Sequence, residues 1–150
     1  MPAAALLCLV VAIADGDTLT ARCHSPDMPG AYRQVHVRIA AIDAPERRQA
    51  YGQRSRQNLA QLCFRQTAAI TPVDTDRYGR TVAQVRCQGA DVSAAQVRAG
   101  MAWAYTTYAQ RYPQLAAQVQ GLEREARAQR QGLWAQPRPL PPWQYRQRHQ

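Results

Sequence analysis

The chain has 150 residues and a formal net charge of +9, and all 19 of its basic residues are arginine. This length is enough for one domain with its own core, and an apolar content of 46% excludes a disordered chain. No apolar run reaches the roughly 18–20 residues that a transmembrane helix needs, so we expect no membrane span. The charge fits a polyanionic partner such as nucleic acid or an acidic membrane surface, although an arginine-favouring genome would produce it too.

The N-terminal part of the chain predicts three β-strands. Strands over residues 6–14 and 17–23 are favoured on either side of the turn Asp15-Gly16-Asp17. After a loop over residues 24–31, alternating apolar residues predict a third strand over residues 32–42.

The first apolar run also resembles the core of a signal peptide. It lacks a basic N-terminal region and leads directly into the turn, so we interpret residues 7–14 as the first strand of the mature domain. Any signal sequence would then lie upstream.

The rest of the chain predicts two more strands and three helices. They are a helix over 53–63, strands over 67–73 and 80–87, a helix over 92–99 between Asp91 and Gly100, and a helix from Pro113 to Gly132. Five short strands with three helices predict a β-barrel plus α fold, namely a five-stranded Greek-key OB-fold barrel. We expect this domain over residues 1–136, followed by a Pro-rich tail over residues 137–150 that is too rich in proline for regular structure.

The four cysteines have no CxxC spacing, which argues against a zinc site. If the Asp15–Asp17 turn closes a hairpin, Cys8 and Cys23 lie nearly opposite each other, and Cys63 and Cys87 pair by elimination. Two disulfides would indicate an oxidising compartment, so we expect a secreted or periplasmic protein. Four reduced, buried thiols are the alternative.

Acidic residues are scarce, and four of the ten lie in two short turns: Asp15, Asp17, Asp43 and Glu46. Hard cations such as Ca²⁺ bind several oxygen ligands, and two turns at one end of a barrel could supply them. Asp-Gly-Asp is equally an ordinary hairpin turn, because aspartate and glycine are favoured in turns.

Arginines accompany these carboxylates. Arg38 lies on the third expected strand, and the segment 76–80 (DRYGR) places two more guanidinium groups around Tyr78. Guanidinium groups bind phosphate oxygens in a bidentate manner, although a single surface arginine is usually just solvated. Together with a carboxylate-bound cation, they would form a metal-assisted phosphoryl-transfer centre.

These motifs, in this order, resemble the staphylococcal nuclease (thermonuclease) family. The resemblance covers about residues 7–135 and is carried by DGDT (15–18), RIAAIDAPE (38–46), YG (51–52), DRYGR (76–80), DVSAAQVRAGMAWAY (91–105) and GLW (132–134). It implies an OB-fold barrel with three helices and Ca²⁺-dependent hydrolysis of DNA and RNA to 3′-phosphate products.

The resemblance also implies roles at the acidic turns. Asp17 and Asp43 match carboxylate ligands of Ca²⁺, and Ala44 matches a ligand that binds through its backbone carbonyl. Asp15 matches an acid beside the cation, and Glu46 matches the general base that acts on the attacking water.

The resemblance to this family also implies a set of substrate contacts. Arg38 and Arg80 match the pair that grips the scissile phosphate, while Arg77 and Tyr78 match residues beside the terminal phosphate. Two positions are candidates for the tyrosines that stack on the nucleotide: Tyr105 and Tyr108.

We weigh three hypotheses. The first is a monomeric Ca²⁺-dependent nuclease that acts on DNA and RNA, with single strands preferred. The second is an inactive nuclease-like module that binds nucleic acid or a partner protein, but such modules usually lose the acidic and arginine positions kept here. The third is a plain single-strand-binding OB-fold, which needs aromatic platforms along its strands, whereas Phe64 is the only phenylalanine here. We favour the nuclease.

Overall fold

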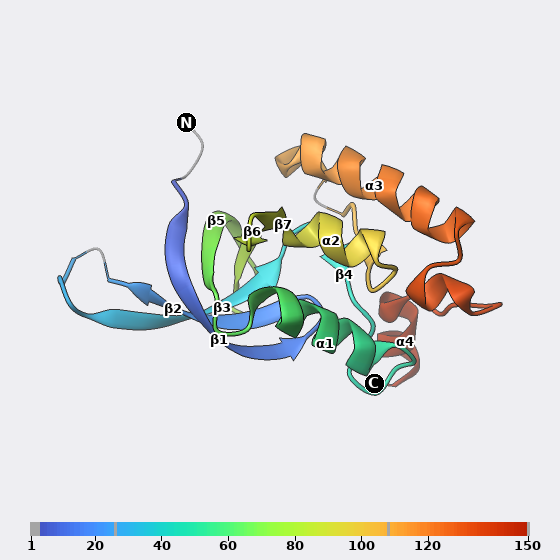
Figure 1. Cartoon of the computed structure of the whole chain (residues 1–150), viewed down its shortest axis with the longest axis horizontal. Coiled ribbons are helices and arrows are strands. Elements are labelled where there is room, and N and C mark those ends of the chain that lie inside the picture. The colour runs from blue at the N-terminus through green and yellow to red at the C-terminus, as the bar shows by residue number, and fades with distance from the viewer. Residues whose placement is uncertain (1–3, 26, 108, 150) are drawn as a thin grey trace.

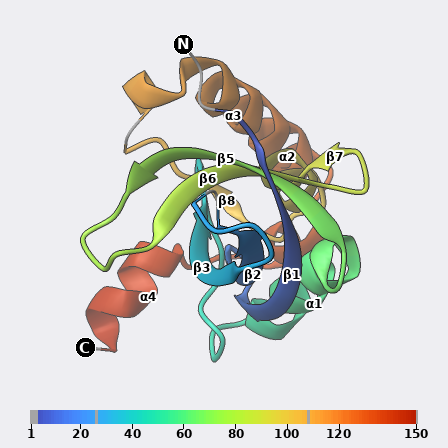
Figure 2. The ribbon, with the colours of Figure 1, turned by 90° about the vertical axis from the view of Figure 1, so that its left-hand side faces the viewer.

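A computed structural model describes residues 4–25, 27–107 and 109–149. Five long strands close into a barrel (Figures 1 and 2). They are β1 (Leu6–Asp15), β2 (Thr18–His24), β3 (Tyr32–Ile39), β5 (Thr67–Thr75) and β6 (Thr81–Cys87). Neighbours in the order β3-β2-β1-β5-β6 are antiparallel, and parallel pairing of β3 with β6 closes the barrel. The predicted five-stranded barrel is therefore confirmed.

The barrel encloses an apolar core. Successive side chains of a strand point to opposite faces, so every second residue faces inward. The inward positions include Leu19, Val37, Ile70 and Val85, all fully buried. Alternation of this kind predicted the third strand from the sequence, whereas the first strand was predicted from a continuous apolar run that leads into a turn.

The third expected strand is shorter than predicted. β3 ends at Ile39, and Ala41 adopts a left-handed backbone conformation (φ 70°) that interrupts the alternation. The chain resumes as β4 (Ile42–Asp43), which pairs antiparallel with β8 (Trp103–Ala104). The other short strand, β7 (Ala90–Asp91), extends the sheet beyond β6.

Three helices form where the sequence predicts them: α1 (Gly52–Cys63), α2 (Val92–Arg98) and α3 (Pro113–Ala128). The Asp91 carboxylate caps α2 by accepting the backbone N–H of Ala94 at 3.0 Å. The third helix ends at Ala128, before the glycine expected to end it. Gly132 instead begins a 3₁₀ turn, η2 (Gly132–Ala135), and a second 3₁₀ turn, η1 (Ala109–Arg111), precedes α3.

The structure corrects the prediction of an irregular tail, because residues Pro142–Arg148 form a fourth helix, α4. Pro141 precedes the helix and Pro142 takes its first position, where a missing N–H group breaks no helical hydrogen bond. The ring of Trp143 then packs against Trp103, with centroids 5.5 Å apart. The prolines therefore start a helix that docks on the body, and the fold has four helices instead of three.

Two disulfides link the four cysteines in the pairing that the sequence predicts. Cys8 and Cys23 are direct cross-strand partners on β1 and β2, and Cys63 at the end of α1 bonds to Cys87 at the end of β6. Among the described residues, no helix is long and apolar enough to cross a lipid bilayer.

Candidate active site

The turn between β1 and β2 positions the first carboxylates. The Asp15 side chain accepts the backbone N–H of Asp17 at 3.2 Å, and the Thr18 hydroxyl donates to the Asp17 carboxylate at 2.9 Å. Gly16 lies so close to α1 that a Cβ atom there would be 1.7 Å from the hydroxyl oxygen of Ser55. Only glycine therefore allows the turn to pack this deeply.

The buried side-chain amide of Gln96 fixes the turn between β1 and β2. The Gln96 side chain, on α2, donates to the backbone carbonyl of Gly16 at 2.7 Å and to that of Ser55 at 3.1 Å. Buried polar groups are costly unless they are hydrogen-bonded, so these bonds fix the turn against both helices. Sequence reasoning missed Gln96 and Ser55, because both look like ordinary polar helix residues.

The second carboxylate comes from β4. Asp43 is only 1% exposed, and its strand is held by pairing with Trp103. The next residue, Ala44, donates its backbone N–H to the Asp17 carboxylate at 2.7 Å. This bond brings the two predicted acidic turns together at one end of the barrel.

Arg38 joins both carboxylates. Its Nη2 atom lies 3.5 Å from an oxygen of Asp17 and 3.5 Å from an oxygen of Asp43, while Nη1 donates to the Ile39 carbonyl at 2.8 Å. The guanidinium group is thus largely buried between two acids at the end of β3. Its pKa is raised, because the attraction of these carboxylates outweighs the effect of burial.

Burial, neighbouring charges and hydrogen bonds shift the pKa of each aspartate. Burial, reinforced by the charge of Asp17, raises the pKa of Asp15 to about 7. Burial also raises the pKa of Asp43, despite its hydrogen bond from an arginine of α4. Burial acts in the same sense on Asp17, but the charge of Arg38 and the hydrogen bonds to the carboxylate keep its pKa below the usual value.

The turn between β5 and β6 supplies the second pair of arginines. Arg80 donates from Nε to the Asp76 carboxylate at 2.8 Å, and Arg77 donates to the Tyr78 hydroxyl at 2.7 Å. Both guanidinium groups lie over the Tyr78 ring, at 4.9 Å for Arg77 and 5.5 Å for Arg80. The ring itself is 68% exposed, so one cationic and aromatic surface borders the carboxylates.

These residues line a single cleft of about 660 Å³. Nine predicted site residues border it: Asp15, Asp17, Arg38, Asp43, Glu46, Arg77, Tyr78, Arg80 and Tyr105. Ala44 is buried and does not line the cleft, and Tyr108 lies outside the described residues. The lining residues that were not predicted as site residues include Arg111, Tyr112 and Arg146. Arg111 forms an ion pair with Asp74.

Glu46 lies in the segment between β4 and α1 and borders the cleft. Its backbone N–H donates to the Gln49 side chain at 3.0 Å, which fixes the chain between β4 and α1. Its carboxylate is one-third exposed and accepts a hydrogen bond of 2.7 Å from Arg146. Glu46 is thus partly accessible to solvent, whereas the neighbouring Asp43 is buried.

Comparison with known proteins shows the family to which the chain belongs. Residues 36–136 match the family described as "Staphylococcal nuclease homologue", and the chain belongs to this family.

Its relatives include several proteins named as nucleases. The chain is 42% identical to "Micrococcal nuclease" of Shigella flexneri, with 91% of this chain and 78% of the relative aligned. It is 39% identical to an "Uncharacterized endonuclease" of Haemophilus influenzae, over 93% of this chain and 72% of that protein. A third relative, "Probable staphylococcal-like nuclease CAN1" of rice, is 37% identical over 76% of this chain and 33% of its own length. Membership of the family and these similarities support a nuclease function.

Proposed function

We propose that this protein is a Ca²⁺-dependent endonuclease that hydrolyses the phosphodiester bonds of DNA and RNA with little sequence preference. The observation that carries the proposal is the buried cluster of Asp17, Asp43 and Arg38 at the cleft, with the guanidinium group of Arg80 on the same cleft wall as Tyr78. Acids that hold a cation and arginines that hold a phosphate together can stabilise the charge that develops during phosphodiester hydrolysis.

The donor atoms suit a hard cation. Asp17, Asp43 and the backbone carbonyl of Ala44 would hold Ca²⁺, which prefers carboxylate and carbonyl oxygens. Among the described residues, no three acidic, histidine or cysteine side chains form a metal cluster, so this set relies on two carboxylates and the backbone. The raised pKa values of Asp15 and Asp43 come first from burial of the carboxyl groups and are increased by the negative charge of Asp17, and a cation bound there would favour the charged forms. A bound Ca²⁺ would supply positive charge against the charge that develops on the phosphate.

The chain's own residues then carry the reaction. Arg38 and Arg80 hold the phosphate oxygens and stabilise the charge that builds on them in the transition state, which requires Arg80 to turn from Asp76 toward the substrate. Glu46 accepts a proton from the water whose oxygen attacks phosphorus. The P–O5′ bond breaks, leaving a 3′-phosphate on one fragment and, after proton uptake by the leaving oxygen, a 5′-hydroxyl on the other.

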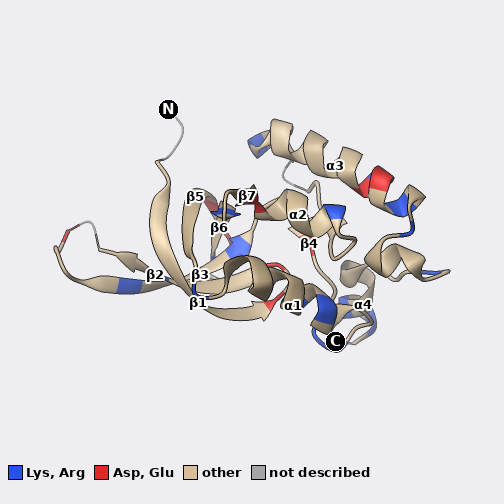
Figure 3. Ribbon diagram, in the orientation of Figure 1, with Lys and Arg blue, Asp and Glu red and all other residues tan. Residues whose placement is uncertain are grey.

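The surroundings of the cleft suit a single-stranded polyanion. The exposed ring of Tyr78, flanked by Arg77, offers a stacking surface to a base that is not paired in a duplex. Arginines are spread over strands, helices and connections, whereas acidic positions are few (Figure 3). Such a field attracts nucleic acid without regard to sequence. We further propose a secreted or periplasmic monomer, because both disulfides suit an oxidising compartment.

The decisive experiment is a nuclease assay with and without Ca²⁺. Purified protein is incubated with single-stranded DNA, duplex DNA and RNA, in Ca²⁺ and in excess EDTA, and the product ends are identified by their sensitivity to a 3′-phosphatase. We expect Ca²⁺-dependent cleavage, fastest on single strands, with 3′-phosphate ends. Cleavage that persists in EDTA would contradict the cation mechanism. Binding of nucleic acid without cleavage in Ca²⁺ would instead indicate an inactive nuclease-like module.

A further inference from the structure

Helix α4 brings a third arginine to the carboxylates. Arg146 donates to both oxygens of Asp43, at 3.2 Å from Nη1 and 2.8 Å from Nη2. The same Nη1 donates to Glu46 at 2.7 Å. One guanidinium group therefore bonds the acid proposed to bind the cation and the acid proposed to accept the proton.

Aromatic packing and a backbone contact hold the helix in this place. The ring of Trp143 lies 5.5 Å from that of Trp103 and 6.2 Å from that of Tyr105. Just before the helix, the Leu140 carbonyl accepts a hydrogen bond of 2.6 Å from the Gln49 side chain. The segment is thus attached to β8 and to the loop that carries Glu46, so Arg146 is delivered by a docked element.

These contacts conflict with binding of a cation. Both oxygens of Asp43 already accept from Arg146, and charge-assisted bidentate bonds of this kind are among the stronger hydrogen bonds. Arg38 is more distant, at 3.5 Å, and can remain as a neighbouring charge. Arg146 is 43% exposed and can swing into solvent, whereas Asp43 is buried and cannot turn away.

We propose that α4 is a latch, in which Arg146 and a divalent cation compete for the Asp43 carboxylate. The inference rests on the cation site proposed above. Without the cation, the latch closes the site by pairing both Asp43 and Glu46. Cation binding releases Arg146 and frees both acids together. By thermodynamic linkage, the docked latch weakens cation binding by the same factor by which the bound cation weakens docking of the latch.

Calorimetric titration of the full chain with Ca²⁺, without nucleic acid, tests the latch. Arg146→Gln removes the competing group, and Trp143→Ala removes the anchor while keeping every charge. Arg148→Gln is the matched control, because it removes an exposed charge from the same helix. We expect both latch variants to bind Ca²⁺ about 3- to 10-fold more tightly than the wild type, the range for loss of a partly exposed ion pair, and the control to bind as the wild type does.

The outcomes separate the latch from simpler explanations. If Arg146→Gln binds no more tightly than Arg148→Gln, there is no competition and the latch is wrong. If Arg146→Gln binds more tightly but Trp143→Ala, checked for folding by circular dichroism, does not, Arg146 acts only through its charge and the latch is again wrong. If neither the wild type nor Arg146→Gln binds Ca²⁺, the proposed cation site itself fails, and the latch fails with it.

Discussion

The backbone amide of Ala44 donates a 2.7 Å hydrogen bond to the Asp17 carboxylate, across 27 positions of the chain. This bond fixes the β1–β2 turn against the segment that follows β4. Both acidic turns, and hence all the proposed cation ligands, are held in one place by the barrel itself. The proposed cation ligands therefore lie on rigid elements, whereas Glu46 and Arg80 are partly exposed and Tyr78 is largely exposed.

Replacing Glu46 by glutamine should abolish most of the activity. The amide keeps the size of the side chain and its position beside the cleft, but it cannot accept the proton of the attacking water. We expect turnover to fall by about 10²–10⁴, the usual contribution of a general base. Steady-state kinetics on single-stranded DNA measures the effect.

The matched control is Glu125→Gln, which removes the same charge from an exposed position on α3. It should cleave at the wild-type rate. A Glu46→Gln enzyme with near-wild-type turnover would remove Glu46 from its proposed role.

Gly52, at the start of α1, should not tolerate a side chain. A Cβ atom there would lie 2.0 Å from the Glu46 carbonyl oxygen and 2.7 Å from that of Arg47, and backbone atoms cannot move aside as a flexible side chain can. We expect Gly52→Ala to destabilise the fold by about 1–3 kcal/mol and to reduce activity, because the loop carrying Glu46 must shift. Thermal unfolding and the nuclease assay report the two effects.

Gly121 provides the opposite case within α3. Its added Cβ would meet only the end of the Arg124 side chain, at 3.8 Å, so alanine there should stabilise the helix by up to about 1 kcal/mol and leave activity unchanged. If Gly52→Ala and Gly121→Ala are equally stable, the close approach of position 52 to the Glu46 carbonyl does not exclude a side chain.

Features that depend on residues close together in the sequence could be predicted, whereas features that depend on contacts between distant residues could not. Strand alternation and turn residues are local, so the barrel and the placement of Asp17 and Asp43 at its end were predictable. The hydrogen bond from Arg146 to Asp43 spans 103 positions and depends on a helix that starts among prolines. No local sequence pattern indicates such a contact. Gln96 escaped for a related reason, since a polar residue on a short helix gives no sign that it will be buried against Gly16.

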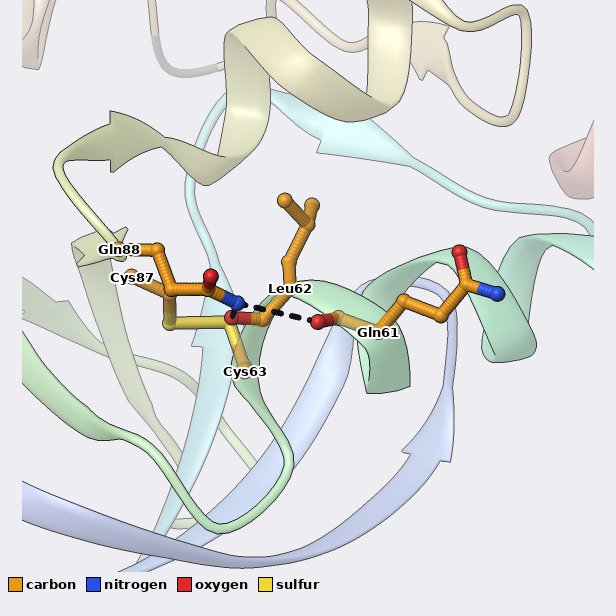
Figure 4. Close-up of a disulfide and its surroundings, with 5 residues drawn as sticks. All are labelled: Gln61, Leu62, Cys63, Cys87 and Gln88. Atoms are coloured by element: carbon orange, nitrogen blue, oxygen red, sulfur yellow. Dashed lines mark hydrogen bonds between the residues drawn. A yellow bond between two sulfur atoms is a disulfide. The ribbon is translucent and has the colours of Figure 1, made fainter.

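The disulfide between Cys63 and Cys87 should make a large contribution to stability. It closes a loop with a sequence separation of 24, and its two ends are also joined by hydrogen bonds from Gln88 to the carbonyls of Gln61 and Leu62 (Figure 4). Loss of loop-closure entropy alone predicts that the double variant Cys63→Ser/Cys87→Ser is less stable by about 3 kcal/mol. Urea unfolding measures the difference, and intact mass after alkylation verifies that the wild type has no free thiol. Unchanged stability after full reduction would contradict a structural role for both disulfides.

Arginines near the start of α1 should bind the substrate beyond the scissile phosphate. Arg48 and Arg54 line a shallow hollow with Arg47 and Tyr51, and no acidic residue in the described part of the chain borders it. If each arginine neutralises one phosphate, Arg48→Gln/Arg54→Gln should reduce the slope of log K against log salt by about 1.4 on single-stranded DNA. Fluorescence anisotropy in EDTA, over a series of NaCl concentrations, measures binding without cleavage.

The control is the double variant Arg124→Gln/Arg130→Gln, which changes the net charge equally at positions on and just after α3. It should leave the slope nearly as in the wild type. Equal slopes for the two double variants would show that the hollow contributes only to the general field and makes no direct phosphate contact.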